Sequence, residues 1–491
     1  MSANDGFAPP PGPAAVIRWG MRRIGGRPAD AGQLTHVVRH TAADGAGITT
    51  FTGRSPFGID QWVYLPFEVP AGTRRITVAA AHQRFTAVPW VARNVLDLGL
   101  FGPDADLRGW SGGARLRFTV SAGDATPGYV PGPVPPGTWA VALGPVVMNP
   151  AGMPWKVRVR VERGDDPAPQ AATGPLPTAV AGRGPGWYRG DMHVHTVHSD
   201  GHRTVRELIG DARDAGLDFI ASTDHNTVSA NRHLGGLDLA GLLVIPGTEV
   251  TTRHGHWLAV GLPDGQWMDW RYRPVDAVFP AVAARLRAAG GVVVAAHPKV
   301  PVPGAAWEFG YDDVDAVEVW NGRWSLDDRA SLWMWDRLLR QGRRLVAVGN
   351  SDCHTLVDAV GSPHTVVHAT GLSARAVLDG VRAGRSYLAT SPGISLSLVA
   401  RSRGRGAAIG GTLHTRGDIE VTATVRGAPW TVLRLHTARG VVARTLVDHR
   451  GRCRLVWRGD APADRFARVE VRRCRPGRAM VAMSNPVWFV A

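Results

Sequence analysis

Histidines and carboxylates gather in one short stretch of the chain, "GDMHVHTVHSDG" at residues 190–201, which holds three histidines and two aspartates between glycines. Imidazole and carboxylate are the side chains that bind transition metals. A lone His-x-His on a strand is, however, more often just two side chains on one face. The stretch predicts half of a metal site only if further ligands follow at matching places.

Such residues do follow, in short motifs that each come where an apolar strand is expected to end. The motifs are "TDHN", "GTEV", "RHGH", "AHPK" and "NSDCH". Twelve of the 18 histidines lie between residues 187 and 392, and eight of these belong to the opening stretch or to these motifs. The ligand-type residues in the motifs are Asp224, His225, Glu249, His254, His256, His297, Asp352 and His354.

The elements between these motifs predict an α/β region over residues 187–392. Thr204 and Glu207 are spaced as a capping box, and apolar residues at helical spacing follow until Gly216. Further helices are expected at 327–341 and 373–383. Apolar strands are expected at 218–223, 242–247, 256–262, 291–297, 315–320 and 344–350. Repeated βα units predict a parallel sheet, most simply a barrel, whose carboxyl strand ends converge on one mouth.

The regions on either side show period-two alternation between turn residues, which is typical of antiparallel sheets. Runs such as "WKVRVRVE" predict a β-sandwich over 15–163, and runs such as "DIEVTATVRG" predict a C-terminal β-sandwich over 393–491. Residues 164–186 are rich in Pro, Gly and Ala and are expected to form a linker. Residues 1–14 are expected to be disordered.

Composition limits the classes of partner. The formal net charge is +15, almost all of it from arginine, but the arginines are spread along the chain and form no basic block, so nucleic acid is an improbable partner. The three cysteines are no disulfide framework. Neither an apolar leader nor a membrane-length run is found, so we expect a cytoplasmic protein with no membrane contact. The oligomeric state stays open.

The combined ligand types favour Zn²⁺, Mn²⁺ or Fe²⁺ over Ca²⁺. They are too many for one ion, so two or three divalent ions are expected as cofactors.

In the order and rough spacing of "DMHVHTVHSDG", "STDHN", "GTEVTT", "AHP" and "NSDCH", the middle region resembles the PHP (polymerase and histidinol phosphatase) superfamily. "GTEVTTRHGHWLAVGL" and "VEVWNG" look like its CehA/McbA-type metallohydrolase branch. The resemblance implies a distorted (β/α)7 PHP barrel, here flanked by the two β-sandwiches, that holds two or three metals.

The resemblance also implies three groups of ligands. They are His193, His195, Glu249 and Asp352 for one ion; Glu249 with His256 and His297 for a second; and Asp200, His225 and His354 for a third. Asp200 stands where some members carry histidine. His254 is the alternative to His256, and Asp224 is expected to orient a histidine.

A site of this kind would generate hydroxide at neutral pH and stabilise charge on a phosphoryl group. It would also need a leaving-group acid and an anion contact. The catalytic candidates are His198, Lys299 and Arg253, and the substrate-contact candidates are Arg323, Asn321, His202 and His254. Lys299 is the best anion contact, because it directly follows the "HP" motif in a chain with only one other lysine. Glu318 and Cys353 are interpreted as structural.

The sequence thus predicts a metal-dependent hydrolase of a small-molecule phosphoester. The resemblance also implies an alternative, a carbamate or carboxylic ester hydrolase of the carbaryl-hydrolase type. Tryptophans near the motifs, which could form an apolar pocket, keep this alternative open; they are Trp257, Trp307, Trp320 and Trp324. A second alternative is a metal-stabilised glycan-binding protein without catalysis.

Overall fold

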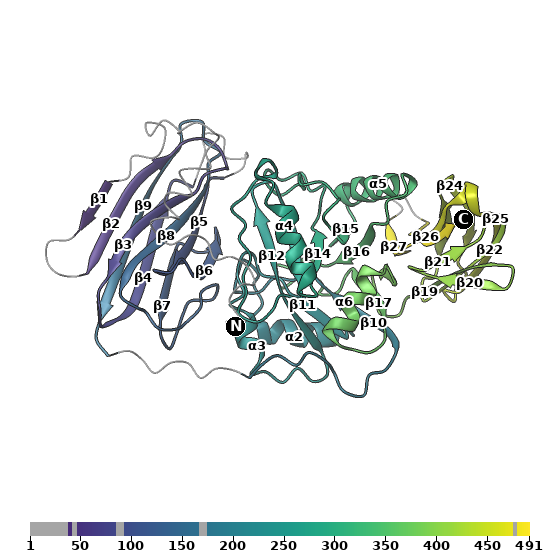
Figure 1. Cartoon of the computed structure of the whole chain (residues 1–491), viewed down its shortest axis with the longest axis horizontal. Helices are drawn as coiled ribbons and strands as arrows, with labels where there is room; N and C mark the ends of the chain where they lie inside the picture. The colour runs from purple at the N-terminus through teal and green to yellow at the C-terminus, as the bar shows by residue number, and fades with distance from the viewer. Residues whose placement is uncertain (1–37, 42–46, 85–92, 166–173, 475–478) are drawn as a thin grey trace.

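The structure, a computed structural model, describes residues 38–41, 47–84, 93–165, 174–474 and 479–491. The N-terminus predicted to be disordered lies outside the described residues. Figure 1 shows three regions side by side: an N-terminal all-β region, a central mixed region and a C-terminal all-β region. Among the described residues no helix is long and apolar enough to cross a membrane.

The N-terminal region is a sandwich of two antiparallel sheets, ordered β1-β2-β9-β4-β7 and β3-β8-β5-β6. Alternating residues of both sheets form one core that includes Phe67, Trp139 and Val157. The strands are β1 (Val38–Thr41), β2 (Ile48–Ser55), β3 (Val63–Val69), β4 (Thr73–His82), β5 (Val95–Phe101), β6 (Leu107–Gly112), β7 (Arg117–Ser121), β8 (Gly137–Val146) and β9 (Met153–Arg163).

The central region is mixed α/β, as predicted, and every strand expected there is present. Its strands are β10 (Gly186–Asp191), β11 (Phe219–Ser222), β12 (Leu243–Thr252), β13 (Gly255–Val260), β14 (Val292–Ala295), β15 (Ala316–Asn321), β16 (Val346–Asn350), β17 (His364–Ala369) and β18 (Ser386–Ala389). Its helices are α2 (Val205–Asp214), α3 (Asn231–Leu234), the 3₁₀ turn η1 (Pro274–Asp276), α4 (Phe279–Ala288), α5 (Leu326–Arg340) and α6 (Ala374–Arg382).

The expectation of an all-parallel sheet was wrong. The pairs β10/β11, β11/β12, β14/β15 and β15/β16 are parallel, but β13 is antiparallel to both β12 and β14. The reason is the connection between β12 and β13, which consists of Arg253 and His254 alone. Two residues suffice for a hairpin, whereas a parallel crossover needs a dozen or more.

The sheet curls toward the predicted barrel, but its end strands β16 and β17 are not paired as neighbouring strands. The sheet runs from β16 through β15, β14, β13, β12, β11 and β10 to β17. Its two ends meet through a side chain, because Thr365 on β17 donates to the carbonyl of Gly349 on β16 at 2.9 Å and accepts from its N–H at 3.0 Å. Closure of the (β/α)7 barrel therefore stays a prediction.

Helix α2 follows the sequence prediction closely. Thr204 and Glu207 form the capping box, and the four apolar residues at helical spacing are buried. Gly216 stands just beyond the helix at φ +71°, a left-handed conformation that glycine adopts without strain. The helix is therefore fixed at both ends and begins four residues after Gly201.

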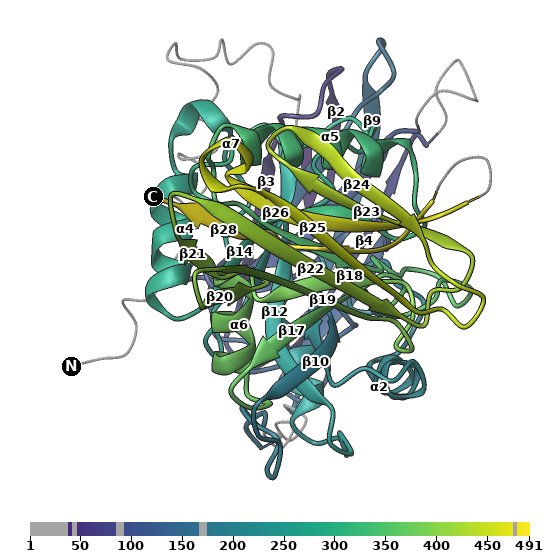
Figure 2. The same cartoon turned by 90° about the vertical axis from the view of Figure 1, so that its right-hand side faces the viewer.

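The C-terminal region continues the central sheet, because β18 pairs with β27 and the order goes on through β26 and β23 to β24. A second sheet, β20-β19-β22-β25, covers it (Figure 2). Its elements are β19 (Ser395–Ser402), β20 (Arg405–Ala408), β21 (Thr412–His414), β22 (Asp418–Arg426), β23 (Thr431–Thr437), β24 (Gly440–Leu446), β25 (Cys453–Asp460), α7 (Ala461–Asp464), β26 (Phe466–Arg473), β27 (Met480–Ser484) and β28 (Val487–Val490).

A buried charge cluster joins α5 to this region. Arg468 on β26 donates to Asp336 of α5 at 2.5 Å and to Glu470 at 2.7 Å. Burial alone would raise the pKa of Glu470, but the Arg468 guanidinium outweighs it and lowers that pKa. Arg468 is the partner that the two carboxylates share, while Asp336 also accepts from Arg340 at 2.7 Å and Glu470 also accepts from Arg472 at 2.6 Å.

The Arg468→Ala variant is expected to lose about 1–3 kcal/mol of unfolding free energy, because each carboxylate would lose its shared buried donor and keep only a more exposed arginine. The control is Arg458→Ala, whose guanidinium pairs with Glu420 while 83% exposed. It should change stability by at most about 0.5 kcal/mol. Urea denaturation of the full chain measures both, and equal losses in the two variants would contradict the expectation.

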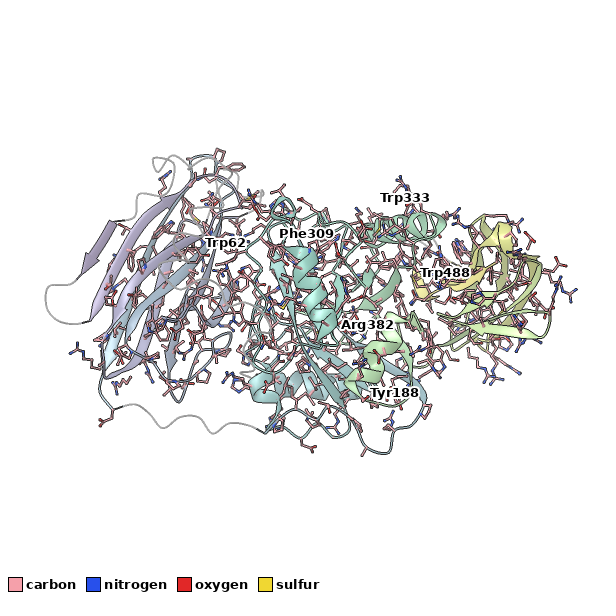
Figure 3. All side chains as sticks on the ribbon, viewed as in Figure 1. Trp62, Tyr188, Phe309, Trp333, Arg382 and Trp488 are labelled. Carbon is pink, nitrogen blue, oxygen red and sulfur yellow. The ribbon has the colours of Figure 1, made fainter. Side chains whose placement is uncertain are left out.

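Aromatic rings fill the junction between the sandwich and the central region. Trp62, which Figure 3 places at this junction, lies with its ring centroid 5.8 Å from Trp110 and 6.4 Å from Trp270 of the central region. Trp270 is fully buried. Burial of rings this large ties the sandwich firmly to the region that holds the candidate site.

Candidate metal centre

The structure brings together all nine residues predicted as metal ligands. They form four overlapping groups, and within each group one ligand atom per residue lies within 4.8 Å of the others. The groups are His193, His195 and Glu249; His193, His297 and Asp352; His225, Glu249 and His256; and His195, Asp200, His225 and His354. The grouping differs from the prediction in that His193, His195 and His225 each belong to two groups.

Glu249 stands at the centre of these groups, and its side chain is completely buried. Its Oε2 lies 3.1 Å from His193 Nε2 and 3.0 Å from His225 Nδ1. Its Oε1 lies 3.0 Å from both His256 Nδ1 and His297 Nε2. Each carboxylate oxygen thus faces a different set of imidazoles, as a carboxylate shared by two ions would.

Asp352 and Asp200 extend the cluster toward solvent. Asp352 Oδ1 lies 3.2 Å from His193 Nε2 and 3.0 Å from His195 Nε2. Asp200 Oδ1 lies 3.5 Å from His354 Nε2, and its side chain is 45% exposed. The group around Asp200 is therefore the most open part of the cluster.

The backbone is bent to aim two of these side chains. His297, just after β14, has φ +23°, and Asp352, just after β16, has φ +49°. Non-glycine residues rarely adopt positive φ, and such strain collects at functional sites. Both bends come where a strand ends, which is where the sequence placed the ligands.

The donor set fits divalent ions. Four ligand atoms that converge here are buried and have no hydrogen-bond partner among the described residues; they are His193 Nε2, His195 Nε2, Glu249 Oε2 and Asp352 Oδ1. Buried polar atoms are normally paired, so orphaned atoms in a cluster call for an ion. Two imidazole nitrogens and two carboxylate oxygens are a set that suits Zn²⁺, Mn²⁺ or Fe²⁺.

The electrostatics of the cluster also favour cations. Burial would raise the pKa of Glu249, but His225 and His193 hold it well below its usual range. Burial lowers the pKa of His256 to about 4, which keeps that imidazole neutral and able to bind a metal. Conversely, the pKa of His193 is raised well above its usual value, because the carboxylates of Asp352 and Glu249 outweigh burial. The buried carboxylates of Glu249 and Asp352 are therefore stabilised by positive charge, which bound metal ions would supply.

Glu318 organises the cluster from behind, a role that the sequence analysis missed when it interpreted this residue as structural. His193 Nδ1 donates to its Oε1 at 3.1 Å, and the backbone N–H of His297 donates to its Oε2 at 2.9 Å. Asn321 donates to Glu318 at 2.8 Å and to Asp352 at 3.1 Å. The only sequence signal was a carboxylate at the end of a buried strand.

Two other predicted roles change. Asn321 was expected to contact substrate, but its amide holds Glu318 and Asp352 in place. Asp224 was expected to orient a histidine, but it accepts from Thr196 and Ser199 at 2.7 Å each. It therefore orders the loop that leads to Asp200.

Three of the predicted catalytic and substrate residues are committed to contacts between regions. His198 is 5% exposed and lies against Ser229 and the N–H of Gly128. Arg253 donates to Asp97 of β5 at 2.6 Å, so its charge is already paired. Both ring nitrogens of His254 face carboxylates, Asp60 at 3.0 Å and Glu308 at 2.7 Å. The structure thus favours His256 over His254 as the ligand.

The remaining candidates lie in loops beside the ligands. Lys299, Arg323 and His202 are all exposed. Lys299 comes two residues after His297, and the N–H of His202 donates to the carbonyl of His354 at 2.7 Å. These residues are available to an anionic substrate.

Three of the four tryptophans that supported an aryl ester as substrate are buried in the core, and the fourth, Trp324, is half-buried. Trp257, Trp307 and Trp320 are 0%, 6% and 1% exposed. Trp257 donates to Tyr272, and Trp307 packs on Phe279 with ring centroids 5.1 Å apart. The burial of these three weakens the observation that favoured an aromatic pocket at the mouth.

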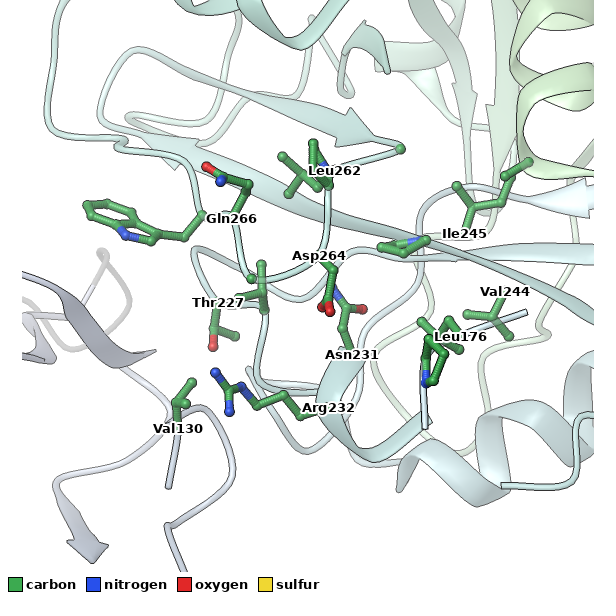
Figure 4. Close-up of a pocket in the computed structure, with 18 of the residues that line it drawn as sticks. Val130, Leu176, Thr227, Asn231, Arg232, Val244, Ile245, Leu262, Asp264 and Gln266 are labelled. Carbon is green, nitrogen blue, oxygen red and sulfur yellow. The ribbon is translucent and has the colours of Figure 1, made fainter. Parts of the chain in front are cut away.

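A separate pocket of about 1040 Å³ opens between the sandwich, the linker and the central region, with Val130, Leu176 and Arg232 among its walls (Figure 4). None of the described residues that line it is a predicted site residue. Cys353 is fully buried, and burial raises the pKa of its thiol to about 12, so it is structural as predicted.

Comparison with known proteins gave remote similarities, and no family model matches the chain. An uncharacterized protein of Methanocaldococcus jannaschii is 27% identical over 146 residues, which cover 27% of this chain and 81% of the relative. A two-domain protein from Bacteroides vulgatus that contains a predicted PHP-like metal-dependent phosphoesterase has a TM-score of 0.35 and 18% identity, covering 65% of this chain and 100% of its own. An amidohydrolase from Chromobacterium violaceum, solved with sulfate and no metal, has a TM-score of 0.27 and 19% identity, covering 35% of this chain and 89% of its own.

Proposed function

We propose that this chain is a metal-dependent hydrolase of the PHP superfamily that cleaves a small-molecule phosphoester. The observation that carries the proposal is the convergence of nine ligand-type side chains, four of which present buried atoms without a hydrogen-bond partner. A structural metal site closes around a single ion, whereas this cluster has ligands for two or three and an open side at Asp200. That difference favours catalysis over a metal-stabilised binding module.

Three sets of side chains would hold the ions. The deepest set contains His193, His195 and Asp352 together with Glu249, and Glu249 would share its second oxygen with His256 and His297. The outermost set is His225, His354 and Asp200. When bound, such ions lower the pKa of water and neutralise charge on phosphoryl oxygens.

Side chains around the ions would orient the ligands and bind the substrate. Glu318 and Asn321 hold His193 and Asp352 in the orientation in which their free atoms converge. The exposed cations Lys299 and Arg323 lie in loops that follow β14 and β15, where they can attract and orient a phosphate group. Two exposed cations in loops beside the ligand motifs, together with the burial of Trp257, Trp307 and Trp320, favour a phosphoester over an aryl carbamate.

The test is metal analysis of the purified chain followed by an activity panel with Mn²⁺ or Zn²⁺. The panel contains phosphomonoesters, phosphodiesters, nucleotides and aryl carbamates, with His193→Ala as the inactive control. We expect metal-dependent cleavage of at least one phosphoester and none by the control. Cleavage of the carbamates alone would overturn the substrate class. If the chain unfolds when its metal is chelated and cleaves no ester after the metal is restored, the proposal that it is an enzyme would be overturned.

Loss of the anion contact gives a further prediction. The Lys299→Ala variant should raise KM for a phosphoester by about 10-fold, equivalent to about 1.4 kcal/mol of lost attraction. Lys156, on strand β9 of the sandwich, supplies the matched control. The measurement is the KM of Lys299→Ala and of Lys156→Ala by steady-state kinetics at equal metal loading. An unchanged KM in Lys299→Ala would show that Lys299 does not contact the substrate.

A further inference from the structure

The loop that carries Asp200 is held from two sides. On the inner side Asp224 accepts from the N–H of Thr196 at 2.8 Å and from the Ser199 hydroxyl at 2.7 Å. The loop also lies directly on the segment after His195, because a Cβ on Gly201 would come within 2.4 Å of the His195 carbonyl carbon. The loop thus has no room to shift inward.

On the outer side the loop is held by the N-terminal sandwich. Arg115, in the turn between β6 and β7, donates from Nη1 to the carbonyl of Ser199 at 2.9 Å and from Nη2 to the carbonyl of Val197. In Figure 1, β6 lies on the side of the sandwich that faces the central region. One guanidinium therefore clamps two carbonyls of the loop, and Ser199 is the residue directly before Asp200.

The sandwich contacts the same loop at a second place, Gly128. Gly128 has φ +97°, and a Cβ there would lie 2.8 Å from the His198 carbonyl oxygen. Its N–H donates to Ser229 at 3.2 Å, and its carbonyl accepts from Thr227 at 2.8 Å. The sandwich is thus fitted against the loop and against the segment that follows His225, so it touches the supports of two residues of the outermost ligand group.

We propose that the N-terminal sandwich is part of the metal centre's framework, and that Arg115 is a positioning residue that holds Asp200 against His225 and His354. The inference rests on the proposed function, since it concerns the ion that these three side chains would share. It gives the sandwich a specific task beyond packing. Asp200 is the most exposed ligand, so it depends most on its loop for its position.

The experiment is metal titration of the full chain by calorimetry, with bound ions counted by elemental analysis. Arg115→Ala should weaken the most weakly bound ion by about 10–100-fold and leave the tighter ions unchanged. Asp200→Ala should lose the same ion. Arg117→Ala, whose exposed side chain lies two residues away on β7, is the matched control and should bind like the parent protein.

A second measurement separates positioning from general damage. The melting temperature in EDTA should be the same for Arg115→Ala and Arg117→Ala, and Arg115→Lys should restore binding only in part, since one ammonium lacks the paired donors of a guanidinium. Full metal binding by Arg115→Ala overturns the inference, and so does equal weakening of every ion. If the parent protein itself binds no ion, the proposed function fails instead.

Discussion

Replacing Glu249 by Gln should abolish hydrolysis, with kcat/KM falling by at least about 10³-fold, which corresponds to about 4 kcal/mol of transition-state stabilisation. Both oxygens of Glu249 are in use, one facing His193 and His225, the other His256 and His297. A glutamine has the same shape but offers one oxygen and one NH₂ donor. Whichever way it turns, one set of imidazoles loses its carboxylate partner.

The measurement pairs activity with metal content. Glu249→Gln should bind at least one ion fewer than the parent protein by elemental analysis, while far-UV circular dichroism stays unchanged. Glu420→Gln is the matched control, because Glu420 lies on β22 of the C-terminal region and pairs, among the described residues, with the exposed Arg458. A Glu249→Gln protein that keeps both its full metal content and its activity would contradict the bridging role.

The nine ligand-type residues could be found from sequence because most of them lie just after an apolar strand, and strand ends of a curled sheet meet at one place; Glu249 lies within β12 and His256 at the start of β13, on either side of one hairpin. That inference needs only local patterns. The error about β13 did not affect this inference, because Glu249 and His256 are diagonal neighbours across the β12–β13 hairpin and their side chains still meet at 3.0 Å.

The supporting residues could not be found in this way. Arg253 and His254 look like site residues in the one-dimensional pattern, because they stand beside His256. Their partners, Asp97 and Asp60, belong to the sandwich and lie more than 150 positions earlier in the chain. Nothing local in the sequence encodes such a pairing, and only the packing of the sandwich on the central region reveals it.

The dependence on distant segments also explains why the sequence did not predict the role of Glu318 in the cluster. Its four donors come from four separate segments: His193, the His297 backbone, Asn321 and Asn350. A carboxylate accepts only, so His193 Nδ1 must carry the proton, and Nε2 is left as the metal-binding nitrogen. Glu318 thus selects the tautomer of His193 without touching the place where an ion would sit, as carboxylates behind metal-binding histidines commonly do.

Glu318→Gln should therefore weaken metal binding by about 10–100-fold and lower activity at limiting metal, with partial recovery at high metal concentration. The substitution replaces one acceptor by an NH₂ group that meets existing N–H donors. Chelator competition measures the affinity. Asp315→Asn is the matched control: Asp315 precedes the opposite end of β15 and accepts from the N–H of Val293 at 2.9 Å, so it loses a comparable hydrogen bond away from the cluster. Equal metal affinity in the two variants would mean that His193 holds its orientation without Glu318, and the inner ligands would then be positioned by the strand ends alone.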